Sequence, residues 1–192
     1  VVLETLAAMI VDTHVHIWEM EPIAPVGPTA ASFTALPDEP ATAEQLLEDM
    51  NEHGVDKTVL VQTSFSTWDN GYVADAAVKH PGRFVSHGLV DPFAENNAEL
   101  ARYWMSERGM RGFRFHPMFY ENEQILSAAR NRTMWDVLDE LNAVIQVHMR
   151  VEHAADFDEI AKAYPGIPLL LDHMSYPDFT DGPDFASHQP IF

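Results

Sequence analysis

Six apolar or β-branched runs alternate with amphipathic segments along the chain. The runs are IVDTHVHIW (residues 10–18), KTVLVQT (57–63), RFVSHGLV (83–90), RGFRFHP (111–117), AVIQVHM (143–149) and IPLLLDH (167–173). Each has the length of a strand, and the later runs begin about 24 to 32 residues apart, the spacing of strands joined through helices. This order predicts repeated βα units with parallel strands, and therefore an α/β fold.

The segments between these strands carry helix end signals. The predicted helices are ATAEQLLEDMNEHG (41–54), NRTMWDVLDELN (131–142) and HAADFDEIAKAYPG (153–166). In the first, Thr42 and Gln45 have the spacing of a capping box, and Gly54 is the predicted stop. The longest connection, residues 19–41, is rich in Pro and Ala. A loop of this length carries function or mobility, or is a solvated excursion without a role.

Side-chain alternation predicts polar residues on one face of several strands, because a strand points successive side chains to opposite faces. The sets that share a face are Ile10, Asp12, His14 and His16; Arg114 and His116, opposite Phe113 and Phe115; Gln146, His148 and Arg150, opposite Ile145, Val147 and Met149; and Leu169, Leu171 and His173. A flat sheet covered by helices needs no polar face, whereas a closed (β/α)8 TIM barrel gathers polar groups at the carboxyl ends of its strands. The pattern therefore favours the barrel.

The length of the chain limits how much of such a barrel it contains. At 192 residues it is long enough for one packed domain, but the barrel typically needs about 250 residues. We expect residues 9–192 to form an incomplete TIM-barrel domain, an amino-terminal fragment with about six of the eight strands. Residues 1–8 precede Met9 and are expected to be a non-structural leader.

Composition excludes several classes of function and partner. The 30 acidic residues against 11 basic ones give a net charge of −19, which argues against nucleic acid or an anionic membrane as a partner. The absence of cysteine excludes disulfides and thiolate metal sites, so a metal site would use histidine and carboxylate ligands. Since no apolar run has the length of a membrane span and the start lacks the basic region of a signal peptide, we expect a cytoplasmic location.

Five segments together resemble the amidohydrolase superfamily. They are DTHVHIW (12–18), DNGYVADAAVKHPGRF (69–84), RGFRFHP (111–117), VHMR (147–150) and LLLDHMSYPD (169–178). More closely they resemble its amidohydrolase-2 branch, which contains lactonases, hydrolases and decarboxylases that act on small organic acids. The resemblance covers nearly the whole chain from residue 9 onward, and it implies a (β/α)8 barrel around a divalent metal.

The resemblance also implies roles for four histidines. His14 and His16 match two metal ligands, His148 matches a third, and His173 matches the catalytic histidine near the metal. Zinc is the expected metal and manganese is the alternative, while some members of the branch work without any metal. The family's eighth-strand aspartate has no counterpart among the six predicted strands. For each histidine, a structural role as a packed or hydrogen-bonded group is the competing interpretation.

Four further residues are predicted to contact the substrate. Arg114 and Arg150 share the polar face, and a guanidinium offers two parallel donors to a carboxylate, although each arginine could instead pair with an interior carboxylate. His116 follows Arg114 on that face, and Trp18 could line the pocket or only pack beside it. Asp12 is expected to be a structural carboxylate rather than a ligand. The expected partner is therefore a small carboxylated molecule, and the resemblance implies that subunits pair as homodimers.

These observations predict a metal-assisted hydrolase that opens a lactone or a similar ester or amide bond of a small carboxylated acid. Water bound to a divalent metal ionises near neutral pH and can attack a carbonyl carbon. Two alternatives stay open. The first is nonoxidative decarboxylation of an aromatic or unsaturated acid on the same fold, because the fold does not determine the reaction. The second is a non-catalytic, truncated chain.

Overall fold

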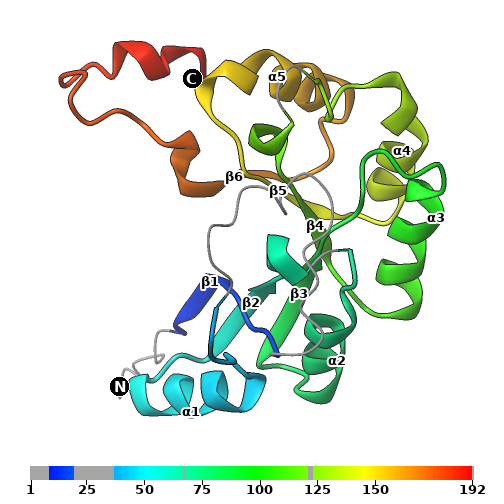
Figure 1. The fold of residues 1–192 in the computed structure, drawn as a ribbon, viewed down its shortest axis with the longest axis vertical. Helices are drawn as coiled ribbons and strands as arrows, with labels where there is room; N and C mark the ends of the chain where they lie inside the picture. Colours follow the sequence, from blue (N-terminus) through cyan, green and yellow to red (C-terminus); the bar gives the residue numbers. More distant parts are fainter. Residues whose placement is uncertain (1–8, 20–36, 67, 121–122, 192) are drawn as a thin grey trace, which may run out of the picture.

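Six parallel strands form one curled sheet in the computed structural model, which describes residues 9–19, 37–66, 68–120 and 123–191 (Figure 1). The strands pair in sequence order, as repeated βα units require. They are β1 (Val11–Val15), β2 (Lys57–Val61), β3 (Phe84–Gly88), β4 (Gly112–Phe115), β5 (Val144–Val147) and β6 (Leu169–Leu171). All six predicted strands are confirmed, each within its predicted run. Together with the helices they form a partial TIM barrel.

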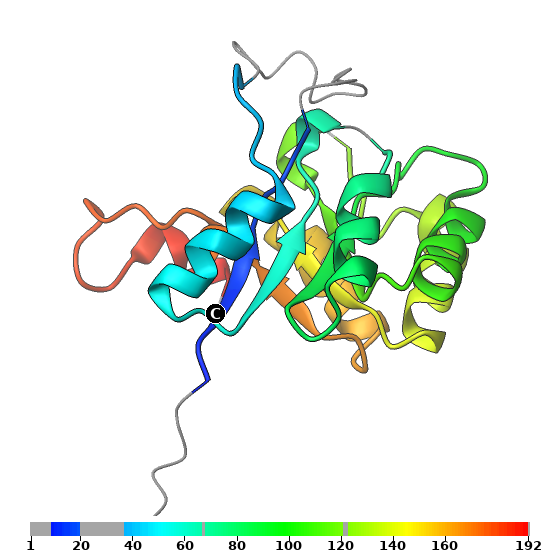
Figure 2. The ribbon, with the colours of Figure 1, turned by 90° about the horizontal axis from the view of Figure 1, so that it is seen from below.

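The helices lie on the outer side of the curled sheet (Figure 1). They are α1 (Ala43–His53), α2 (Gly71–Lys79), α3 (Asn97–Arg102), which continues as a π-helix (Tyr103–Glu107), α4 (Arg132–Glu140) and α5 (Ala154–Ala163). Short 3-10 turns are η2 (Ser64–Ser66), η4 (Pro117–Phe119), η5 (Ala129–Asn131), η6 (Val151–His153), η7 (Asp172–Ser175) and η8 (Ala186–Ile191). In both ribbon views the C-terminal segment, orange to red, lies apart from α2, α3 and α4 (Figures 1 and 2).

The predicted capping box and the predicted C-terminal glycine of α1 are both confirmed. The Thr42 hydroxyl accepts a hydrogen bond from the Gln45 backbone N–H, and the Gln45 side chain accepts one from the Thr42 backbone N–H. Gly54 ends the helix with a φ of 70°, the left-handed conformation that glycine adopts without steric cost. The helices predicted over 131–142 and 153–166 are confirmed as α4 and α5, with slightly shorter bounds.

Replacing Thr42 by alanine is expected to lower the free energy of unfolding by about 1 kcal/mol, because an N-terminal backbone N–H of α1 loses its acceptor. The midpoint of urea unfolding measures the loss. The control is Thr133→Ala, at an exposed position inside α4, where alanine is the better helix former. Equal midpoints for Thr42→Ala and the unaltered chain would show that the capping box contributes nothing.

The hydrophobic core lies between the sheet and the helices. Phe113, Phe115, Ile145 and Val147 are fully buried, and the Phe115 ring packs against Trp135 of α4 with their centroids 5.5 Å apart. The opposite face of these strands is polar, because Arg114 of β4 is in register with Gln146 of β5. The predicted alternation in β4 and β5 is therefore confirmed, and the concave face of the sheet carries the polar side chains.

A register shift interrupts the predicted alternation in β1. Asp12 is in register with Thr58, and Val15 with Leu60, so three residues of β1 span the length of two residues of β2. Asp12 and Val15 consequently share a face, and His14 points to the other one. The expectation that Asp12 shares a face with His14 and His16 is wrong, because the extra residue reverses the alternation between them.

The last strand also differs from its predicted length. β6 ends at Leu171, and the backbone of His173 takes a φ of 53°, outside the strand conformation. His173 therefore does not continue the face of Leu169 and Leu171, and its side chain is exposed. The preceding residue, Asp172, is buried and points to the polar face.

β1 and β6 are the end strands of the sheet formed by the described residues. Apolar side chains on or beside them are exposed, among them Ile10, Val11 and Leu170. No helix in the described part of the chain is long and apolar enough to cross a membrane. The predicted leader, residues 1–8, and most of the predicted long loop, residues 20–36, lie outside the described residues.

Candidate active site

His14 and His16 lie at the carboxyl end of β1, with their rings in a T-shaped contact at 5.0 Å between centroids. His16 Nδ1 is 2.7 Å from the carbonyl oxygen of Val61. Because a carbonyl oxygen only accepts hydrogen bonds, Nδ1 carries the hydrogen, and Nε2 keeps its lone pair. A backbone carbonyl that orients a histidine in this way is typical of metal-ligating histidines. The Nε2 atom of His14 is buried and has no hydrogen-bond partner.

A buried ion pair joins the ends of β4 and β6. Arg114 Nε lies 2.5 Å from Asp172 Oδ2, and the two residues are 5% and 6% exposed. The other carboxylate oxygen of Asp172 lies 3.7 Å from His14 Nδ1. Asp172 therefore connects strands from both ends of the sheet. It is a site residue that the sequence analysis missed, although the alternative that Arg114 pairs with an interior carboxylate is confirmed.

A row of three side chains runs from the interior of the site to its mouth. His116 Nδ1 and His148 Nδ1 are 3.0 Å apart, and His148 Nε2 lies 2.5 Å from the Tyr176 hydroxyl. His116 also stacks on Phe119, with 5.1 Å between ring centroids, and its Nε2 is buried without a partner. Tyr176 is the second residue of the site that the sequence analysis missed.

The remaining predicted site residues lie at the rim. The His173 ring is 5.9 Å from that of His14 and 5.4 Å from that of His148, so it stands beside the cluster although it is exposed. Arg150 is exposed, with its guanidinium 5.4 Å above the ring of Tyr176. Trp18 donates from Nε1 to the carbonyl oxygen of Glu39 and forms a backbone bridge with Ala41. The structure thus brings the five predicted histidines and Arg114 together, leaves Arg150 exposed over Tyr176, and engages Trp18 with Glu39 and Ala41.

Lowered pKa values favour the neutral form of the half-buried His14 and His16 and of the buried His116 and His148 at pH 7. Burial, assisted by the positive charge of Arg114, lowers the pKa of His14 to about 4 and that of His148 to about 3. Burial followed by the charge of Arg114 also holds the pKa of His116 well below its usual value, and burial lowers that of His16. A neutral imidazole keeps a lone pair, which is the form that binds a metal or accepts a proton.

These lowered pKa values predict a stability that falls in acid. Unfolding exposes the histidines to water, where their pKa returns to about 6.5. Their contribution to the free energy of unfolding is therefore complete above pH 6.5 and is lost as the pH falls toward 4. Urea unfolding in the presence of a chelator, from pH 8 to pH 4.5, measures this decline. Replacing His148 by asparagine should flatten it, whereas replacing the exposed His53 should not; equal slopes in all three proteins would contradict the prediction.

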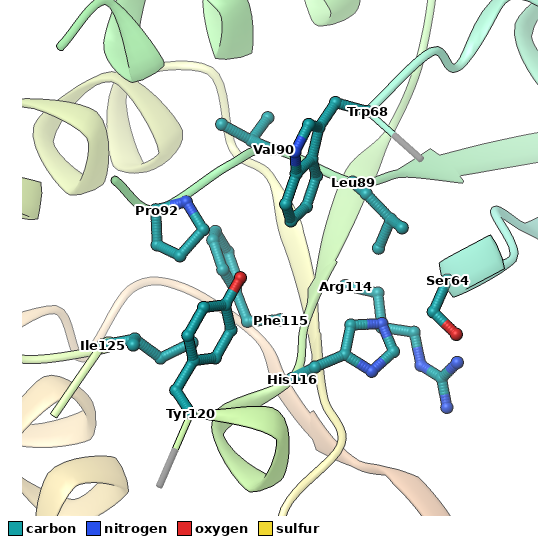
Figure 3. A pocket seen from close by; sticks show the side chains of 10 residues that line it. All are labelled: Ser64, Trp68, Leu89, Val90, Pro92, Arg114, Phe115, His116, Tyr120 and Ile125. Carbon is teal, nitrogen blue, oxygen red and sulfur yellow. The ribbon is translucent and has the colours of Figure 1, made fainter. Parts of the chain in front are cut away.

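A pocket next to the cluster has one polar and one apolar wall (Figure 3). It opens at the carboxyl ends of β2, β3 and β4, where a TIM barrel places its loops. The polar wall contains Arg114 and His116, together with Ser64. The apolar wall contains Trp68, Leu89, Val90, Pro92, Phe115, Tyr120 and Ile125. The space enclosed between the two walls is about 10 Å³, about enough for one water molecule, so a small organic molecule would fit there only if the walls moved apart.

The described residues meet only part of the expected metal-ligand set. His14 Nε2 is buried and free of partners, and His16 Nε2 has its lone pair, so both histidines fit the role of ligand. His148 does not fit it in this arrangement, because both of its ring nitrogens already face side chains. Accordingly, no group of three or more potential ligand side chains comes together among the described residues in a way that could hold a metal.

Solved structures with the same fold include proteins described as 2-pyrone-4,6-dicarboxylic acid hydrolases. A probable one from Acinetobacter baumannii, with citric acid bound, is 21% identical over 96% of this chain and 65% of its own, with a TM-score of 0.75. A candidate one from Pseudomonas putida is 26% identical over 93% of this chain and 63% of its own, with a TM-score of 0.70. This chain thus spans less than two thirds of their length.

A decarboxylase shares the fold as well. The 5-carboxyvanillate decarboxylase of Novosphingobium aromaticivorans, with bound manganese, is 18% identical over 88% of this chain and 67% of its own, with a TM-score of 0.67. The family model described as amidohydrolase matches residues 11–192, nearly the whole chain. The family predicted from the five segments is therefore confirmed, and the chain belongs to the amidohydrolase family.

Proposed function

We propose that this chain carries the metal-binding and substrate-binding residues of a hydrolase that opens a lactone, or a similar ester or amide bond, of a small carboxylated acid. The observation that carries the proposal is the cluster of neutral histidines from β1, β4 and β5 beside a buried arginine. In a TIM barrel this edge is where catalytic residues collect. The likeness to proteins described as pyrone dicarboxylic acid hydrolases supports the substrate class.

In this proposal His14 and His16 would hold a divalent cation through their Nε2 atoms, and His148 would become the third donor only after its Nε2 leaves the Tyr176 hydroxyl. A bound cation supplies Lewis acidity and an ionised water at neutral pH. Imidazole donors favour zinc among the common divalent metals, and manganese is the alternative. His173, exposed beside His14 and His148, would polarise the substrate carbonyl or accept a proton from the attacking water.

Once the walls of the pocket move apart, its polar wall would hold the substrate. Asp172 engages only one of the five N–H donors of Arg114, so the guanidinium can also bind a substrate carboxylate. His116 and the exposed Arg150 extend this positive and polar surface toward the mouth, with Trp18 at its edge. In a chain with a net charge of −19, these arginines supply the local attraction that an anionic substrate needs.

Nonoxidative decarboxylation is the second candidate. The apolar wall formed by Trp68, Phe115 and Tyr120 stands directly beside Arg114 and His116. If these walls moved apart, the arrangement would hold an aromatic ring against apolar side chains and its carboxylate against the arginine. The fold shared with 5-carboxyvanillate decarboxylase agrees with this candidate.

The test combines metal content with product analysis. The chain, purified without chelator, is expected to contain about one equivalent of zinc or manganese, which His14→Ala/His16→Ala loses and the control His53→Ala keeps. Incubation with 2-pyrone-4,6-dicarboxylate should give the ring-opened acid without gas release. Release of carbon dioxide from an aromatic acid would favour the decarboxylase instead. Metal-free protein with neither activity would overturn both candidates for this chain and support the non-catalytic alternative.

A further inference from the structure

The imidazole of His148 differs from those of His14 and His16 in having both ring nitrogens engaged. Nδ1 faces His116 Nδ1 at 3.0 Å, and Nε2 faces the Tyr176 hydroxyl at 2.5 Å. When Nδ1 of His148 donates to His116, Nε2 carries the lone pair and accepts from the tyrosine O–H. A cation binds a histidine through that same lone pair. The hydroxyl of Tyr176 therefore stands where a metal ligated by His148 would stand.

The segment that holds Tyr176 in this position is strained. His173, Met174, Ser175 and Tyr176 have φ values of 53° to 58°, so four consecutive residues other than glycine adopt the left-handed conformation. In this conformation Cβ crowds the neighbouring carbonyl oxygen, and such segments persist only where their surroundings hold them.

Contacts with other elements hold this turn, in addition to those of the His173 ring with His14 and His148. The carbonyl oxygen of Met174 lies 2.7 Å from Nε2 of the buried His188, and the guanidinium of Arg150 lies over the Tyr176 ring. A further contact is the hydrogen bond between the Tyr176 hydroxyl and Nε2 of His148. Since Tyr176 itself is 42% exposed, little packing opposes its departure once that hydrogen bond is replaced.

We propose that Tyr176 occupies the ligand position of His148, so that a divalent cation recruits this histidine only by displacing the tyrosine hydroxyl. The inference rests on the proposed metal-assisted function. It makes Tyr176 a positioning residue that competes with the cation and weakens its binding. After displacement the contact between Nδ1 of His148 and His116 remains, and it orients the ring in the way that a hydrogen-bond partner orients a ligating histidine.

The experiment measures zinc affinity directly, by competition with a chromophoric chelator, and needs no substrate. Tyr176→Phe removes the hydroxyl and keeps the ring, and we expect it to bind zinc about three- to tenfold more tightly, the worth of one neutral hydrogen bond. The same substitution in a His148→Ala background should give no gain, because the competition acts through His148. Tyr103→Phe, at another exposed tyrosine on the outer helices, is the matched control and should bind zinc as the unaltered chain does.

Each other outcome would overturn the inference. An unchanged affinity in Tyr176→Phe would leave the metal-assisted function in place and remove Tyr176 from it. A weaker affinity would show that the hydroxyl is itself a ligand. If Tyr176→Phe also tightens zinc binding in the His148→Ala background, the substitution acts through the turn and not through His148. Absence of zinc binding in every variant would overturn the proposed function as well. Tyr176→Leu provides a second variant if the phenylalanine protein is poorly folded.

Discussion

Replacing Asp172 by alanine is expected to lower the free energy of unfolding by about 3 to 5 kcal/mol, because it leaves the guanidinium of Arg114 buried without its counter-charge. An isolated buried charge loses its hydration and gains nothing in return. The carboxylate also stands 3.7 Å from His14, so the ends of three strands lose a common contact. Urea unfolding at pH 7.5 measures the change.

Two further variants separate this effect from the loss of any ion pair. Glu140→Ala removes the partner of Arg102 in an exposed pair and should cost about 1 kcal/mol or less. Arg114→Met combined with Asp172→Leu replaces both charges by apolar groups and should recover most of the stability, as exchanges of buried pairs often do. A loss below about 1 kcal/mol in Asp172→Ala would mean that water reaches Arg114 and that the pair is not truly buried.

Replacing Gly112 by alanine is expected to prevent β4 from pairing with β5, with a loss of about 3 kcal/mol or more, or no folded protein at all. A Cβ at this position would lie 1.8 Å from the carbonyl oxygen of Val144 in the neighbouring strand. Backbone cannot move aside as a flexible side chain can, so the two strands would have to separate.

Soluble yield and the far-ultraviolet circular dichroism of Gly112→Ala check this expectation. Gly166→Ala is the control, because the nearest atom to a Cβ there is a side-chain oxygen of Asp139 at 3.2 Å, which can rotate away. If Gly112→Ala folds with the stability of the control, the strands must tolerate a larger spacing than the structure shows.

The strands could be predicted from the sequence because each is a short apolar or β-branched run, at the spacing of strands joined through helices. Two of the helices carried no such clear signal. Asn70 and Asn96 precede α2 and α3, but neither caps its helix through the side chain. The Asn70 amide instead bonds to the backbone N–H and carbonyl of Leu89, a contact between segments distant in sequence. A pattern read residue by residue does not reveal this contact.

The candidate site could be predicted where alternation holds and not where it breaks. Arg114, His116 and His148 share the concave face as their spacing predicts. β6 ends at Leu171, two residues before the end of the predicted run, and the left-handed turn that follows removes His173 from the strand. Asp172 was missed because the pattern assigned the polar position at the end of this strand to His173. The signal that could have revealed Asp172 was Arg114, since a predicted interior arginine requires a nearby carboxylate.

If His14 and His16 hold a cation as proposed, their location on an end strand would link cation binding to assembly. In the described part of the chain β1 has a neighbour only on the β2 side, and its other edge presents backbone donors and acceptors to any strand that joins it. A strand bound there would order the backbone that carries both histidines. The two binding equilibria are thermodynamically linked. A strand that raises the cation affinity when it joins this edge is itself bound more tightly, by the same factor, when the cation is present. Cation binding and strand addition at β1 would then be coupled. If the added strand belongs to a second copy of the chain, the fraction of chains with a bound cation would rise with protein concentration.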